Sequence, residues 1–163
     1  VLMFSSMLSG AIINHFDAAF TSYPILVSFM TMISGTGGNS GSQSSTLIIR
    51  GMATDEIKGR DYFRVVWKEF RVALLCAVAL GLMNGLRVFI QYRDFPLALV
   101  IFLTLICTVV FSKLLGCSLP MLAKKIHVDP AIMATPFIST IVDACSMFLY
   151  FAIAMHILHI SAA

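Results

Sequence analysis

Apolar side chains fill long uninterrupted stretches of this chain, and few charged residues separate them. Stretches without Asp, Glu, Lys or Arg are residues 1–16, 18–49, 72–86, 95–112, 130–142 and 144–163. An unpaired backbone polar group costs several kcal/mol in hydrocarbon, so such stretches cross a membrane as helices or as a closed barrel. The apolar residues are continuous rather than alternating, which is not the barrel pattern. The pattern therefore predicts an all-α membrane protein.

The same pattern predicts five transmembrane helices per subunit. They cover about residues 1–15, 20–34, 72–91, 95–119 and 130–159, and the second continues into a Gly/Ser-rich stretch. The first is shorter than the roughly 20 residues that a span needs. Because the chain opens at Val1 inside this stretch, without a signal-peptide pattern, we expect it to be a fragment of a longer protein.

Residues 54–71 form the one long hydrophilic segment, and aromatic and aliphatic side chains recur in it at intervals of three and four. These are Tyr62, Phe63, Val66, Trp67 and Phe70. The spacing predicts a cytoplasmic amphipathic connecting helix on the membrane surface, with Thr54 as its N-cap.

Lys and Arg residues indicate the orientation of the chain. They concentrate in two segments, residues 50–71 and 124–125, which the positive-inside rule places in the cytoplasm. With five spans, the N-terminus is then cytoplasmic and the C-terminus extracytoplasmic, in a multi-pass protein of the cell (inner) membrane. Lys113, near the end of a span, is expected to reach the interface with its long side chain.

Composition excludes several classes of protein. Charged residues make up 12% and apolar residues 59% of the chain, too few polar side chains to cover a soluble domain. The net charge of +3 is scattered, so no nucleic-acid partner is expected. The four cysteines show no metal or redox spacing and are interpreted as packing residues.

Asp143 is the carboxylate that lies well inside an apolar stretch. A charge there is costly, so Asp143 should face the bundle interior or an aqueous path and bind a cation or proton. Its helical neighbours at intervals of three, four and seven or eight residues are polar or small; they are Thr135, Pro136, Ser139, Thr140 and Ser146. The alternative is a protonated Asp143 that makes a single helix–helix hydrogen bond.

Residues 35–46 contain four glycines and no apolar side chain. Gly37 and Gly41 form a small-residue face suited to close helix approach, which we expect to serve a dimer. Asn39, Ser42 and Gln43 offer neutral polar groups for a hydrated cation. A flexible linker is the alternative interpretation.

Two motifs together resemble the membrane domain of the MgtE magnesium channel family. The first is Thr36-Gly37-Gly38-Asn39, continued by residues 40–47 and Arg50-Gly51; the second is residues 136–144, which end in Asp143-Ala144. Their order and spacing, and the five predicted spans, match the family. The resemblance thus covers essentially the whole chain, and residues 1–163 would be its ion-conducting domain, without the cytoplasmic N-terminal and CBS domains that family members usually have.

The resemblance implies a homodimer in the lipid bilayer, with a pore between the subunits that passes hydrated Mg²⁺, other divalent ions such as Mn²⁺ or Ca²⁺ remaining open. The second and fifth helices would line this pore. Asp143 would bind the ion from both subunits, and Ser139 would contribute one turn away. The other residues expected to line the pore are Gly38, Asn39, Thr135, Pro136 and Thr140.

The sequence is also compatible with two other functions. A proton- or sodium-coupled divalent cation exchanger could use Asp143 as its coupling carboxylate, although the two halves of the chain show no self-similarity. A structural subunit without transport would leave Asp143 unexplained. An enzyme is not expected, since the spans contain no nucleophile–base pair and no metal-binding His cluster.

Overall fold

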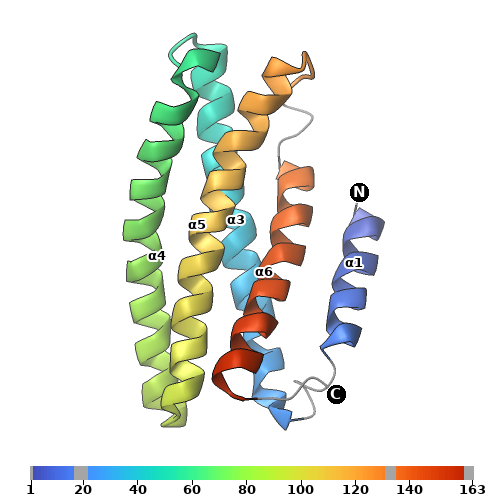
Figure 1. The fold of residues 1–163 in the computed structure, drawn as a ribbon, viewed down its shortest axis with the longest axis vertical. Helices are drawn as coiled ribbons and strands as arrows, with labels where there is room; N and C mark the ends of the chain where they lie inside the picture. The colour runs from blue at the N-terminus through green and yellow to red at the C-terminus, as the bar shows by residue number, and fades with distance from the viewer. Residues whose placement is uncertain (1, 17–21, 131–134, 160–163) are drawn as a thin grey trace.

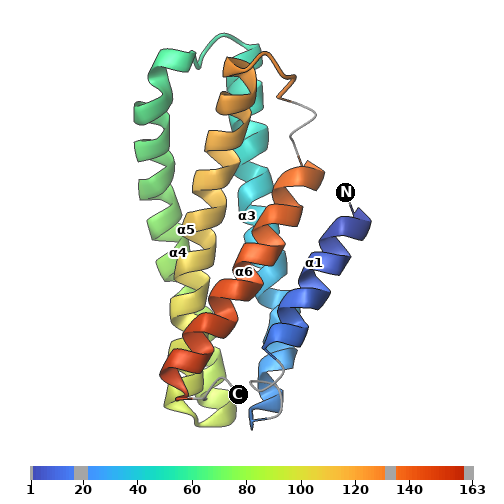
Figure 2. The ribbon, with the colours of Figure 1, turned by 45° about the vertical axis from the view of Figure 1, so that its right-hand side comes forward.

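The computed structural model describes residues 2–16, 22–130 and 135–159, which form a bundle of long helices (Figure 1). The helices are α1 (Leu2–His15), α3 (Val27–Ala53), α4 (Tyr62–Tyr92), α5 (Phe95–Lys125) and α6 (Thr135–Ile157), with short 3-10 turns η1 (Pro24–Leu26) before α3 and η2 (Gly59–Asp61) before α4. From α3 onward, successive helices alternate in direction, and α1 lies beside α6 at the edge of the bundle (Figures 1 and 2). The described residues contain no strand, so the all-α prediction is confirmed.

Among the described residues, three helical segments are long and apolar enough to cross a membrane: Gly59–Tyr92, Phe95–Lys125 and Phe137–Ile157. Helix α1 has only 14 described residues. Helix α3 has 27 residues and is about 40 Å long, longer than the ~30 Å hydrocarbon core, but its second half is polar. The count of five spans therefore stays a prediction, although all five predicted segments contain a helix.

Residues 54–71 do not form the separate surface helix that the sequence predicts. Thr54 is the C-cap of α3, where its N–H and its Oγ1 both donate to the Arg50 carbonyl. Helix α4 then starts at Tyr62 and continues without a break to Tyr92. Neither Pro nor Gly occurs between Gly59 and Gly81, so nothing ends the helix where the chain turns apolar. The aromatic residues at 62–70 thus belong to the first turns of α4 and not to a separate helix on the membrane surface.

The core of the bundle has two apolar clusters with a more polar region between them. One apolar cluster joins α3, α5 and α6 around Ile33, Ile101 and Phe151, and a second lies at the other end around Ile48 and Met121. Between them, small and polar residues of α3, α5 and α6 are buried together with a few aliphatic ones such as Val142. The small and polar residues are Gly37, Gly41, Ser44, Ser45, Thr104, Thr108, Ser112, Gly116, Thr140 and Ser146. This arrangement encloses one face of the polar half of α3, while Asn39 and Gln43 on its other face stay exposed.

Glycines bring α3 into direct contact with its neighbours. A Cβ on Gly116 of α5 would overlap the backbone carbonyl of Gly41 in α3. A Cβ on Gly37 would lie 2.8 Å from the Ser146 Oγ and 2.8 Å from the Thr108 Cγ2. The face formed by Gly37 and Gly41 is therefore used inside the subunit, against α5 and α6. Our expectation that it serves a dimer contact is wrong.

Replacing Gly116 by Ala should destabilise the protein by about 1–3 kcal/mol, because the added methyl group must push α3 and α5 apart. The matched control is Gly10→Ala in α1, where nothing lies within 4 Å of the added atom. Thermal unfolding in detergent measures both. Equal midpoints for the two variants would contradict the close approach of α3 and α5.

Candidate ion-binding site

Asp143 lies on the side of α6 that packs against α3. The Ser34 Oγ of α3 donates a hydrogen bond of 2.8 Å to the Asp143 Oδ1. The Asp143 side chain is half-buried, so one part of the carboxylate contacts protein and the rest stays accessible. The side chain therefore sits at the edge of the α3–α6 contact and not in the core.

Gly38 and Ser139 complete this part of the surface. A Cβ on Gly38 would lie 3.3 Å from the Asp143 Oδ1 and 3.8 Å from the Ser139 Cβ. Because Ser34 and Gly38 are one turn apart on α3, and Ser139 and Asp143 one turn apart on α6, the two helices meet along matching faces. The absence of a side chain at Gly38 keeps the carboxylate open on this side.

The other predicted pore residues fall in different environments. Asn39 is exposed, as is Gln43 one turn later, so both point away from the subunit core. Thr140 is buried at 8% exposure, on the protein side of α6. Thr135 and Pro136 form the first turn of α6, but their side chains lie outside the described part. The structure thus groups Gly38, Ser139 and Asp143, and leaves Asn39 on a separate outward face.

Sequence reasoning missed Ser34 as the partner of Asp143. Ser34 precedes the Gly/Ser-rich stretch and is the last residue of the preceding apolar segment. The helical register could have identified it, because Ser34, Gly38 and Ser42 recur at intervals of four and so lie on one face of α3.

Within the described residues, the Asp143 carboxylate forms no ion pair. The described part also contains no group of three or more His, Cys, Asp or Glu side chains that could hold a metal. What remains at Asp143 is one carboxylate and nearby hydroxyl groups. This is the donor set of a hard cation that keeps most of its own water.

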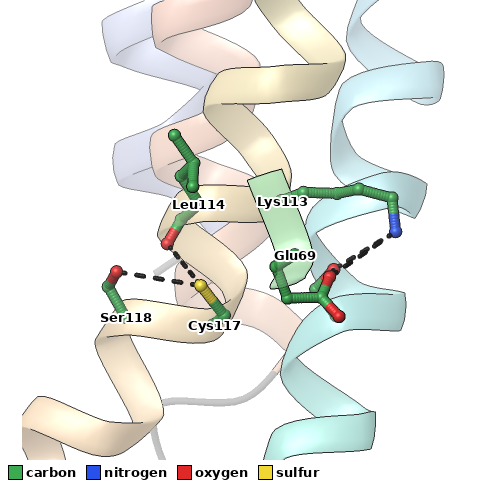
Figure 3. Close-up of polar contacts among 6 residues, drawn as sticks. Glu69, Lys113, Leu114, Cys117 and Ser118 are labelled. Atoms are coloured by element: carbon green, nitrogen blue, oxygen red, sulfur yellow. Dashed lines mark hydrogen bonds and ion pairs between the residues drawn. The ribbon is translucent and has the colours of Figure 1, made fainter. Parts of the chain in front are cut away.

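The sequence prediction for Lys113 is wrong, because its ammonium is buried and does not reach the interface. The Lys113 Nζ lies 3.9 Å from the Glu69 Oε2 of α4 and donates a 3.3 Å hydrogen bond to the Ser44 Oγ of α3. Ser44 in turn donates a 2.8 Å hydrogen bond to the same Glu69 oxygen. Figure 3 shows this cluster, which links three helices. Since Lys113 is paired with Glu69, it is not a counter-charge for Asp143.

Figure 3 also shows Cys117, one turn after Lys113 on α5. Its thiol is buried, is not in a disulfide, and donates to the Leu114 carbonyl at 3.2 Å. This agrees with the interpretation of Cys117 as a packing residue.

The sequence profile of the MgtE family, described as "Divalent cation transporter", matches residues 30–153. The chain belongs to this family. The match runs from Met30 in α3 to Ile153 in α6, and it includes Ser34, Gly38, Ser139 and Asp143. The resemblance noted from the two motifs is confirmed, and the family is one of transporters rather than enzymes.

Individual relatives agree with the family match. The chain is 31% identical over 159 residues to the magnesium transporter MgtE of Bacillus subtilis, covering 98% of this chain and 35% of the relative. It is 34% identical over 155 residues to the magnesium transporter MgtE of Thermus thermophilus, covering 94% of this chain and 34% of the relative. The protein of that name in Enterococcus faecalis is 31% identical over 153 residues, again 94% of this chain and 34% of the relative. The chain thus spans about a third of the length of these relatives.

Glu69 and Lys113 should depend on each other for stability. Removing one partner of a buried pair costs about 3–5 kcal/mol, because it leaves the other charge uncompensated, while replacing both by apolar residues is often neutral. We expect Glu69→Leu and Lys113→Met each to lower the free energy of unfolding by about 3 kcal/mol, and the double variant to lose less than either.

The exposed residues Glu56 and Lys68 provide matched controls, as Glu56→Leu and Lys68→Met. These two changes should have small and additive effects. Additive losses for the Glu69 and Lys113 variants, measured by unfolding in detergent, would contradict the buried pair.

Proposed function

We propose that this chain is the Mg²⁺-conducting part of a divalent cation transporter and that Asp143 binds the passing ion. The observation that carries the proposal is the half-buried Asp143 carboxylate, which a serine hydroxyl orients and no cation neutralises within the described residues. An ionised side chain at this depth is costly unless it meets a counter-charge. A divalent cation supplied from solution fits that requirement.

Magnesium suits the chemistry of this face better than a soft metal. Mg²⁺ prefers octahedral oxygen coordination and loses its water slowly, so it binds few protein ligands directly. One carboxylate with nearby hydroxyl groups can hold such an ion through its water shell. The names of the three relatives, all magnesium transporters, point to the same ion.

A homodimer supplies the second carboxylate. One Asp143 cannot balance a divalent charge, whereas a two-fold axis beside the α3–α6 surface would bring two copies to one ion. Asn39, Gly38 and Ser139 would then line the path, and Thr135 and Pro136, in the first turn of α6, would lie near its end. Thr140 is buried on the protein side of α6, so its predicted place in the pore lining is wrong for this subunit. The exposure of Asn39 supports this proposal, since a side chain that faces a second subunit lies on the surface of the first.

The same proposal includes the topology and the domain. Residues 1–163 would form one ion-conducting domain with five spans in the cell membrane. Its Lys/Arg-rich end would face the cytoplasm, the N-terminus would be cytoplasmic and the C-terminus extracytoplasmic.

Asp143→Asn should reduce Mg²⁺ flux into proteoliposomes more than tenfold, a change equivalent to ~1.4 kcal/mol or more of lost ion stabilisation. Stabilisation of the protein by Mg²⁺ in thermal unfolding should disappear with it. The control is Asp55→Asn, an exposed residue with a φ of 58°, a backbone conformation that Asn also tolerates. Persistence of both Mg²⁺ responses in Asp143→Asn would refute the site.

A pH gradient distinguishes a channel from the coupled exchanger, which uses the same carboxylate. We expect Mg²⁺ flux driven by a Mg²⁺ gradient alone, with an unchanged rate when the pH and sodium gradients are abolished. A magnesium-sensitive dye inside the vesicles gives the rate. Flux that stops without either gradient would favour the exchanger.

A further inference from the structure

A cleft that does not include Asp143 is lined by residues from the end of α3, the start of α4 and the end of α5. Figure 2 shows that these three helix ends lie at the same end of the bundle. It has a volume of about 700 Å³. Arg60, Lys124 and Lys125 line it, and no Asp or Glu does. None of these three cations is in an ion pair with another described residue, although the Lys124 Nζ donates to the Met52 carbonyl at 3.3 Å. The cleft therefore presents uncompensated positive charge.

A neighbouring cleft at the same end of the bundle has a different charge pattern. Its lining mixes three cations with three carboxylates: Arg50, Glu56, Asp61, Arg64, Lys68 and Glu69. The Asp61 carboxylate belongs to this mixed cleft and accepts a 3.0 Å hydrogen bond from the Lys58 N–H. The acidic residues Glu56, Asp61 and Glu69 thus line the mixed cleft and not the basic cleft.

The remaining wall of the basic cleft is apolar and continues into the surface of the span. Phe63 lines the cleft and is 83% exposed, and Leu122 opposite is 47% exposed. One turn along α4 from Phe63 lies Trp67, at 63% exposure, and exposed leucines continue this face of the helix. A ligand that fits has an anionic head and a long apolar tail.

We propose that this cleft binds the phosphate headgroup of an anionic phospholipid, with the acyl chains lying along the exposed face of α4. The basic residues hold the phosphate, as basic pockets between transmembrane helices do. Phe63 and Trp67 contact the chains at the depth where aromatic side chains favour the interface. The inference does not depend on which ion the protein transports.

Trp67 is the single tryptophan of the chain, so its fluorescence reports lipid contact directly. Lipids brominated in the acyl chain quench it on contact. In vesicles of phosphatidylcholine, brominated phosphatidylglycerol should quench Trp67 at a lower mole fraction than brominated phosphatidylcholine. Arg60→Gln, Lys124→Gln and Lys125→Gln together should lower that preference about 100-fold, since each cation near a membrane surface contributes about fivefold.

The matched control variant neutralises the three cations of the mixed cleft, with Arg50, Arg64 and Lys68 each changed to Gln. It should keep most of the preference. Lys124 also donates a hydrogen bond to the Met52 carbonyl, so its replacement could disturb the fold. A second variant therefore changes Arg60 and Lys125 alone, and its preference for phosphatidylglycerol should fall about 25-fold.

Three results would overturn the proposal. They are equal quenching by the two brominated lipids, an equal loss of preference in the control variant, and displacement of the brominated phosphatidylglycerol by soluble glycerol phosphate at the same concentration. The last result would assign the cleft to a free phosphate instead of a lipid.

Discussion

The polar half of α3 can pack inside an otherwise apolar bundle only where its neighbours enclose it and satisfy its polar groups. Its small residues make this possible, because Gly41 packs directly on Gly116 of α5 and Gly37 on α6. The buried ion pair of Glu69 and Lys113 then joins α3 to α4 and α5 through Ser44. These contacts fix the face of α3 that remains open, and on this face Ser34 and Gly38 meet Asp143.

Local sequence predicts the helical class, which is confirmed, and it singles out Asp143, whose role in ion binding stays a prediction. Long apolar stretches fix the helical class, and a lone carboxylate inside one of them marks Asp143 without knowledge of the fold. The polar stripe around it follows from helical periodicity. The small-residue face of Gly37 and Gly41 was also recognised, but its partner was not, because small residues favour close packing inside a subunit as much as between subunits.

The features that depend on distant residues were missed or misassigned. Ser34 and Asp143 are 109 positions apart, and Ser44 and Lys113 are 69 apart, so no spacing rule connects them. The prediction of a separate surface helix at residues 62–71 was wrong for another reason. An amphipathic pattern with aromatic residues is typical of a surface helix, and it is equally typical of the turns of a long transmembrane helix that lie at the membrane interface. Thr54 is similarly ambiguous, since its hydroxyl can cap either helix end.

The central claim is that two copies of Asp143 share one divalent ion. Co-expression of this chain with its Asp143→Asn variant, at known ratios, gives vesicles whose dimers contain two, one or no carboxylates. If both are needed, Mg²⁺ flux follows the square of the unchanged fraction, so that an equal mixture retains about a quarter of the flux, as random pairing of subunits gives. Flux proportional to the unchanged fraction would mean that each subunit conducts alone, and would contradict the shared site.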